Sequence, residues 1–281
     1  MDTSSLLNRI NIDFPDFDIN KYEIISEWYD NHILDINWEY IFRFSKKWVN
    51  FKKEADFLIW ISNKLKIDVP FPKYMPSDYS YTWYRKIKWV QLKNQILDQI
   101  SKKDKDVIAF ELAEFLSVIH SSRDLIQTIN MQLPIYNKME IYYNKAINKL
   151  SSTLDKDVLN FANEIIESWK NLNKVEISDF VILHNDLYSR NIIVNPDNKR
   201  ISWIIDFSDM TEWDRCIDFV SLYFENSDFA KLVIKKYEEI NWFKLDIQKV
   251  DLYAKIFALN EFFWNDANNK PIADRWIFVN N

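Results

Sequence analysis

The sequence contains no glycine among its 281 residues. Average usage near 7% would give about twenty, so chance sampling does not account for the absence. We interpret it as the mark of a glycine-free variant of a natural protein; a coding bias towards Ile, Asn and Lys is the alternative source of part of it. Turns must therefore use other residues. Asn37-Trp38, for example, stands between two alternating segments where Asn-Gly is the usual hairpin turn.

Cysteine and histidine are scarce, and no long apolar run is present. The single cysteine, Cys216, excludes an internal disulfide, and three scattered histidines make no credible zinc site. The N-terminus lacks the basic and apolar parts of a signal peptide, and no apolar run approaches the length that spans a bilayer. We expect a cytoplasmic protein that makes no membrane contact, and we expect it to be a monomer.

The charge balance is acidic. The net charge is −6 and the isoelectric point is near 5.3, which argues against general nucleic-acid affinity. Acids that cluster near a site would favour a cationic ligand. The length and the 48% hydrophobic content are enough for one large domain or two modest ones.

The most informative stretch, residues 181–194, consists of two short apolar segments with a polar loop between them. His184, Asp186 and Asn191 form the pattern H-x-D-x-x-x-x-N in this loop, and Asp206 follows a further apolar segment. In phosphoryl transfer a carboxylate accepts the proton of the attacking hydroxyl, and oxygen ligands hold magnesium on the nucleotide phosphates. We expect Asp186 and His184 to be catalytic, with Asp186 as the proton acceptor, and Asn191 and Asp206 to bind Mg2+. The alternative is that these residues only cap turns, which does not require this spacing.

Residues 22–44 alternate in the manner of strands and predict the start of a three-stranded sheet. Residues 48–65 follow with helical periodicity, and Glu54 falls on the apolar face. A buried carboxylate is costly unless paired, so we expect a partner cation on the third strand, either Arg43 or Lys46. The alternatives are a solvent-facing strand charge for Arg43 and a helix-rim position for Glu54.

The segment 81–89 predicts a strand that runs into a connector between two lobes. The backbone from Arg85 to Ile87 would meet a purine edge there, although a sheet edge with alternate basic residues explains the pattern equally well. Beyond this connector the periodicity is helical. Residues 106–120 predict a buried core helix, and residues 136–173 predict further amphipathic helix.

Over most of its length the chain resembles the aminoglycoside phosphotransferases, most closely the 2''-O-phosphotransferase branch. The segments that carry this resemblance are residues 16–20, 40–44, 53–55, 85–88, 114–120, 184–191 and 204–209. A further segment, Asp214 to Phe219, is similar to the family's D-P-x-x-D-F signature, with Arg215 in place of proline. The resemblance implies that Asp218 braces the catalytic loop.

The resemblance also implies an α+β, two-lobed protein-kinase-like fold. A small β-rich lobe over residues 1–88 would bind the nucleotide, with Arg43 or Lys46, oriented by Glu54, at its phosphates. A larger, mainly helical lobe over residues 89–281 would be the catalytic and substrate-binding part. The reaction would move the γ-phosphate of GTP or ATP, with Mg2+, to a hydroxyl of an aminoglycoside antibiotic, which confers resistance. Because aminoglycosides are polycationic, acids would hold them, and Asp209, Glu225 and Glu261 are the candidates.

Six positions depart from the glycine that family members generally carry, namely Ser26, Trp28, Trp89, Asn185, Trp203 and Ser208. Ser26 and Trp28 stand in the loop that covers the phosphates, where an indole would obstruct close approach, and Asn185 stands in the catalytic loop, where Asn tolerates left-handed backbone. Two alternatives to an aminoglycoside kinase therefore stay open. One is a kinase of another small alcohol, such as a macrolide, choline or homoserine, and the other is an inactive scaffold with the same fold.

Overall fold

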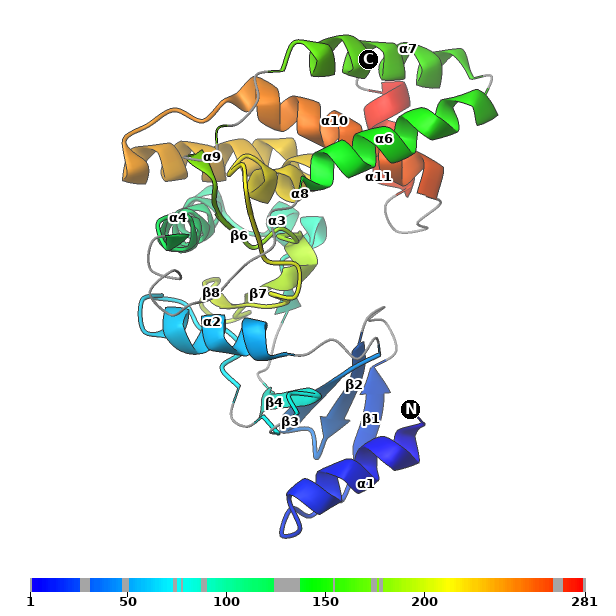
Figure 1. Ribbon diagram of the computed structural model, residues 1–281. Coiled ribbons are helices and arrows are strands. Elements are labelled where there is room, and N and C mark those ends of the chain that lie inside the picture. Colours follow the sequence, from blue (N-terminus) through cyan, green and yellow to red (C-terminus); the bar gives the residue numbers. More distant parts are fainter. Residues whose placement is uncertain are drawn as a thin grey trace.

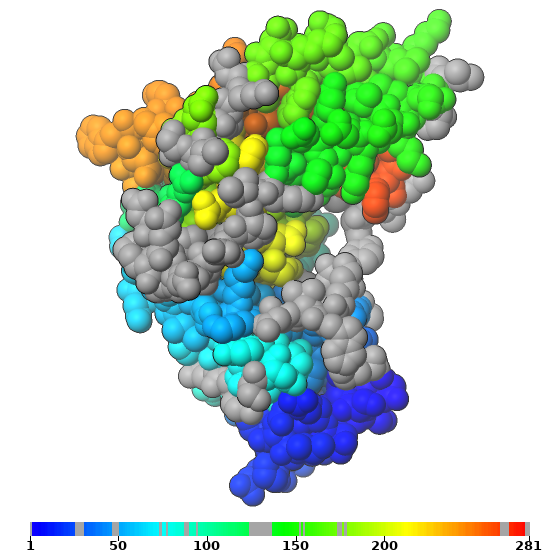
Figure 2. Space-filling model, in the orientation of Figure 1, coloured from blue at the N-terminus to red at the C-terminus, as the bar shows by residue number. Residues whose placement is uncertain are grey.

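The computed structural model describes residues 2–25, 31–46, 51–72, 75–76, 78–86, 90–123, 137–153, 155–172, 176, 179–264 and 270–279. The chain forms two lobes, a small antiparallel sheet with its helices and a larger helical lobe (Figure 1). The space-filling view shows the N-terminal residues at one end of an elongated molecule and the residues of the green helices at the other (Figure 2). The predicted α+β, kinase-like class is confirmed. The predicted boundary between residues 88 and 89 falls outside the described residues and stays a prediction.

The small lobe is built on a four-stranded antiparallel sheet in the order β1-β2-β3-β4. Its strands are β1 (Tyr22–Ile25), β2 (Asn31–Ile36), β3 (Tyr40–Ser45) and β4 (Tyr81–Arg85). The predicted three strands are therefore present, and β4 adds a fourth beside β3. Asn37 and Trp38 make the turn between β2 and β3 with φ of 56° and 61°, so a tryptophan takes the left-handed backbone that glycine usually supplies.

Strand alternation divides the side chains of this sheet between two faces. Helix α1 (Thr3–Asp13) covers one face, where Leu6 and Ile10 pack against Leu34, Phe42 and other strand residues. Because successive side chains in a strand point to opposite faces, Arg43 lies on the other face, towards the large lobe. Helix α2 (Lys52–Ser62) joins the core of the large lobe rather than the core under α1. It is shorter than the predicted 48–65, although residues 47–50 are not described.

Two small sheets form the part of the large lobe that carries the catalytic loop. One has the order β5-β7-β8, and the other pairs β6 with β9. Their bounds are β5 (Val90–Gln91), β6 (Val181–Leu183), β7 (Ile192–Val194), β8 (Ile201–Ile204) and β9 (Thr211–Trp213), with the turn η3 (Ser189–Asn191) before β7. All three residues of β6 and all three of β7 are buried.

Helices make up the rest of the large lobe. They are α3 (Asn94–Gln99), α4 (Lys102–His120), α6 (Lys138–Lys149), η1 (Leu150–Ser152), α7 (Lys156–Lys170), α8 (Ile217–Glu225), α9 (Ser227–Asn241), α10 (Ile247–Trp264), α11 (Lys270–Asp274) and the π-helical turn η4 (Arg275–Val279). The predicted helix 106–120 is confirmed and begins earlier, because the Ser101 hydroxyl caps it by accepting from Asp104 N. Within the described residues, no helix is long and apolar enough to span a membrane.

Candidate active site

The catalytic loop and the segment after β8 end side by side because of strand pairing. β6 leads into residues 184–191, and β7 then pairs with β8 so that Ile192 lies opposite Ile204. The amide of Ile205 donates to the carbonyl of Asn191 at 3.0 Å. This register brings Asn191, at the start of β7, next to Asp206, just after β8. The two predicted metal ligands therefore come from adjoining strand ends.

Asp186 is held by the side chain of Asn191. Asn191 Nδ2 donates to the Asp186 carboxylate at 3.0 Å and to the Asp186 carbonyl at 2.7 Å. The Asp186 side chain is 18% exposed, so it is oriented by its neighbours and remains accessible. Arg190 Nη2 lies 3.7 Å from the same carboxylate, and its guanidinium is 3.9 Å from the ring centroid of Tyr188. This geometry suits a carboxylate that accepts a proton from an incoming hydroxyl.

His184 is fully buried, and both its ring nitrogens meet backbone groups. Nε2 bonds to the carbonyl of Ile205 at 3.0 Å, while Nδ1 lies 3.4 Å from the amide of Asp186. This pairing corresponds to the tautomer that carries its proton on Nε2. The ring also contacts Phe207 with centroids 4.6 Å apart. His184 therefore ties the catalytic loop to the segment that carries Asp206, and its catalytic role stays a prediction.

Asp218, on α8, braces the same loop. Its carboxylate accepts from the amide of His184 at 3.0 Å and from the amide of Asn185 at 2.7 Å. His120 Nε2 adds a bond at 3.1 Å, and His120 Nδ1 meets the Tyr237 hydroxyl at 2.7 Å. Burial lowers the pKa of His120, which favours a neutral ring that donates from Nε2 and accepts at Nδ1. The bonds to His184 and Asn185 confirm the predicted brace.

Arg43 connects the small lobe to this loop region. Its Nη1 donates to Glu54 at 2.6 Å and its Nη2 to Asp206 at 3.1 Å, and all three side chains are largely buried. Burial alone would lower the pKa of Arg43, but the Glu54 and Asp206 carboxylates reverse this and raise it. The predicted partner of Glu54 is thus Arg43. Lys46, the alternative, lies exposed just beyond the end of β3.

Asn191 and Asp206 fit a magnesium ion. Asn191 Oδ1 is buried without a hydrogen-bond partner, although buried acceptors are normally satisfied. Asp206 Oδ1 accepts from the Ser208 hydroxyl at 2.8 Å as well as from Arg43. Amide and carboxylate oxygens are the donors that Mg2+ takes alongside phosphate oxygens. Among the described residues, no group of three or more His, Cys, Asp or Glu side chains forms a metal cage.

The three candidate substrate acids differ in their burial and in their contact with the catalytic loop. Glu225 Oε2 accepts from the amide of Ser189 at 2.8 Å, and burial raises its pKa. Asp209 is about half exposed at the side chain, and partial burial raises its pKa while Lys138 opposes the shift. Glu261 is buried on α10. It contributes to the raised pKa of Tyr188, after burial, Asp186 and Tyr142.

Several predicted nucleotide-site positions lie outside the described residues, namely Ser26, Trp28 and Ile87. Arg85 is described and lies exposed at the end of β4, where it pairs across the sheet with Tyr40. The geometry therefore leaves the assignment of these four residues to the nucleotide as a prediction.

Two cations at the site escaped the sequence analysis. Arg190 lies four residues after Asp186, a spacing that could have drawn attention to it. Lys138 contacts the catalytic loop from α6, and the signal was a lysine at the start of a helix, where the helix dipole disfavours a cation.

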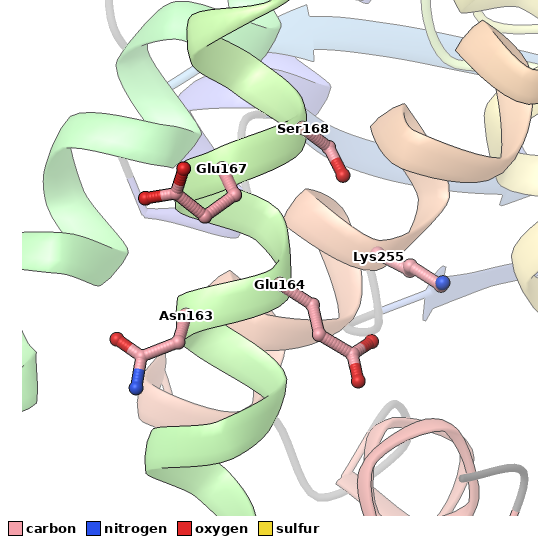
Figure 3. A pocket seen from close by; sticks show the side chains of 5 residues that line it. All are labelled: Asn163, Glu164, Glu167, Ser168 and Lys255. Carbon is pink, nitrogen blue, oxygen red and sulfur yellow. The ribbon is translucent and has the colours of Figure 1, made fainter.

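A separate groove of about 500 Å³ lies between α7 and α10. Its lining residues are Asn163, Glu164, Glu167, Ser168 and Lys255 (Figure 3). None of the residues predicted for catalysis or for nucleotide, metal or substrate binding belongs to it. The groove is therefore distinct from the site around Asp186.

Comparison with known proteins identifies the family and the fold. Residues 22–245 match the model of the phosphotransferase enzyme family. The fold is similar to the GDP complex of wild-type aminoglycoside 2'-phosphotransferase-IIIa, with TM-score 0.79 and 21% identity over 99% of this chain and 97% of that one. It is also similar to the GDP and kanamycin complex of APH(2'')-IIIa, with TM-score 0.79 and 20% identity over 97% of both chains. A macrolide 2'-phosphotransferase of type I aligns with TM-score 0.70 and 13% identity over 100% and 99%.

Proposed function

Because the chain belongs to the phosphotransferase enzyme family, we propose that it transfers the γ-phosphate of GTP or ATP to a hydroxyl of an aminoglycoside. The observation that carries this proposal is the arrangement at Asp186. Its carboxylate is fixed by Asn191 Nδ2, while the other atom of the same amide, Oδ1, is buried and unpaired. One asparagine thus orients a base and offers an oxygen to a metal.

Each residue has a distinct part in the proposed reaction. Asp186 accepts the proton of the acceptor hydroxyl as that oxygen attacks the γ-phosphorus, and the bond from this phosphorus to the β,γ-bridging oxygen breaks, so that the nucleoside diphosphate leaves. Asn191 and Asp206 would hold Mg2+, which neutralises charge on the nucleotide phosphates when bound. Arg43, kept in place by Glu54, presents a guanidinium to those phosphates. Asp218 keeps the loop backbone fixed, which matters because positioning supplies much of the rate in phosphoryl transfer.

The acids support a cationic acceptor. Glu225 touches the catalytic loop at Ser189, and Asp209 lies in the segment after Asp206. Carboxylates around a catalytic base would attract the ammonium groups of an aminoglycoside, and structures of similar fold have been obtained with kanamycin and gentamicin. We further propose that the protein works as a cytoplasmic monomer.

The test is release of nucleoside diphosphate from GTP or ATP with magnesium and a panel of aminoglycosides. Aminoglycoside-dependent turnover is expected, and Asp186→Asn should lower kcat by about 10³-fold or more, since a proton acceptor and its charge are lost together. Asp197→Asn, in the exposed turn between β7 and β8, is the matched control and should leave turnover unchanged. A folded protein without turnover on any member of the panel would reject the proposal.

Macrolides form the second arm of that panel, because the macrolide phosphotransferase shares the fold. Turnover with macrolides but not with aminoglycosides would assign the protein to that acceptor class. Glu225→Gln separates the two cases. It should raise the KM of a polycationic aminoglycoside several-fold and have a smaller effect on a macrolide, which carries fewer positive charges.

A further inference from the structure

Lys138, the first residue of α6, reaches the catalytic loop from the helical part of the large lobe. Lys138 is only 8% exposed. Nζ donates to the carbonyl of Asn185 at 2.7 Å and lies 3.9 Å from the carboxylate of Asp209. A single ammonium group therefore contacts the loop that carries Asp186 and the segment that follows Asp206.

The position of Lys138 is unfavourable in two respects. A cation in the first turn of a helix opposes the helix dipole, and burial of an ammonium group costs free energy unless it is paired. Glu140 and the Asn137 cap supply the usual favourable groups of this helix start. Its contacts with Asn185, with Asp209 and with the ring of Tyr142 help to offset the cost of its placement.

Asn185 is fixed by three different parts of the fold. Its backbone is left-handed, with φ of 66°. Its amide donates to Asp218 at 2.7 Å, its side-chain Nδ2 donates to the carbonyl of Asp209 at 2.9 Å, and its carbonyl accepts from Lys138. That carbonyl belongs to the peptide unit that joins Asn185 to Asp186. The orientation of this peptide determines where the chain enters Asp186.

We propose that Lys138 is a positioning residue, which fixes the peptide before Asp186 and so couples α6 to the catalytic base. The proposal rests on the function proposed above. Helix α6 packs against α10, which carries Glu261. The bond from Lys138 to Asn185 therefore connects this pair of helices, which belongs to the proposed acceptor site, to the loop that carries Asp186. Arg43 and Asp206, the residues proposed for phosphate and metal, are held by the bond between them and by the bond from Arg43 to Glu54.

The variants Lys138→Met and Lys138→Arg test this role. Methionine keeps the length and the apolar stem but cannot donate, whereas arginine keeps both donor and charge. We expect Lys138→Met to lower kcat by roughly 10- to 100-fold, since small misplacement of a catalytic group has effects of this size, with the nucleotide KM within about twofold of wild type. Lys138→Arg should recover most of the kcat. Lys145→Met, at an exposed position of the same helix, is the matched control and should behave as wild type.

An unchanged kcat in Lys138→Met would overturn the proposal, as would an equal loss in Lys145→Met. If the methionine variant does not fold, Lys138→Gln takes its place, because it keeps a donor but not the reach or the charge. Its kcat should fall with nucleotide KM retained.

Hydrogen exchange of the peptide that covers residues 183–191 gives a readout that does not depend on turnover. Exchange should be faster in Lys138→Met than in wild type and near wild type in Lys138→Arg. If wild type shows no turnover but exchange follows this pattern, the proposed function fails and the contact stands. If wild type turns over and exchange is unchanged in Lys138→Met, the positioning role is wrong.

Discussion

Arg43 of the small lobe donates a hydrogen bond to the Asp206 carboxylate of the large lobe at 3.1 Å. The same guanidinium donates to Glu54 at 2.6 Å, so one cation joins an acid on α2 to an acid after β8. These two carboxylates keep the cation charged in a buried place. A bound nucleotide with magnesium would bring phosphates to this cation and a metal to Asp206, and the contact therefore marks where the two lobes meet the proposed substrate.

Replacement of Arg43 should damage both stability and activity. In Arg43→Met, Glu54 would remain buried without its partner, which typically costs about 3–5 kcal/mol of the free energy of unfolding. The kcat/KM for the nucleotide should also fall by at least about 10²-fold, because a charge that neutralises phosphate is lost. Urea unfolding and steady-state kinetics measure the two effects.

The exposed pair between Lys52 and Asp56 provides the control for this change. Both side chains are substantially exposed, and exposed pairs contribute about 0–1 kcal/mol. Lys52→Met should therefore leave stability and nucleotide kinetics nearly unchanged. Equal stability losses in the two variants would show that the buried ion pairs of Arg43 stabilise the fold no more than an exposed pair does.

Asn191 should determine the response to magnesium. In Asn191→Ala the unpaired Oδ1 and the donor to Asp186 are both removed. We expect the magnesium concentration for half-maximal turnover to rise about tenfold or more, a magnitude typical of weakened metal ligation. Magnesium titration at fixed nucleotide measures it. Asn195→Ala, which removes the acceptor of an exposed turn bond from Asp197, is the control. A magnesium response that matches wild type would exclude Asn191 as a ligand.

Trp242 occupies a left-handed backbone position after α9 that glycine would take at a lower free-energy cost. It follows α9 with φ of 57° and is 93% exposed, so its side chain buries almost nothing to offset a left-handed backbone. Left-handed backbone costs a residue with a Cβ roughly 1–2 kcal/mol, so Trp242→Gly should raise the free energy of unfolding by about 1 kcal/mol after the extra chain entropy of glycine is counted. Trp242→Ala keeps the Cβ and should change little. Equal stabilisation by Ala and Gly would contradict the backbone explanation.

Glu225 predicts a pH dependence of stability. Burial raises the pKa of this carboxyl above its ordinary value of 4.5, so the folded state holds the proton to a higher pH than the unfolded state. Stability therefore falls as pH rises from about 4.5 through the raised pKa of the folded state. Glu225→Gln cannot ionise and can still accept from Ser189.

Urea unfolding of both proteins at a series of pH values checks this sign. The glutamine variant should gain stability relative to wild type as pH rises above about 4.5, by about 1.4 kcal/mol for each unit of pKa shift. A difference between the two proteins that is the same at every pH would contradict a raised pKa.

Much of the site was predictable because it depends on local order. The spacing from His184 to Asn191 and the apolar segments around it predicted a strand, a loop and a strand, and pairing of β7 with β8 then requires Asp206 to lie beside Asn191. Helical periodicity placed Glu54 on the inward face of α2, whereas the sequence left Arg43 either inward or facing solvent, and the structure shows it buried on the face opposite the α1 core. Two side chains of opposite charge that face inward from adjacent elements form an ion pair, because burial of either charge alone would be costly.

The sequence by itself determined the pattern of the catalytic loop, which follows from spacing within one segment, and its family resemblance implied the class of fold. It limited the partner of Glu54 to Arg43 or Lys46. Only the tertiary structure decided which groups hold that loop. Lys138 and Asn185 are 47 positions apart, and their contact depends on how α6 packs against α10. Such packing is set by the fit of many side chains at once, and no local pattern in the sequence records it.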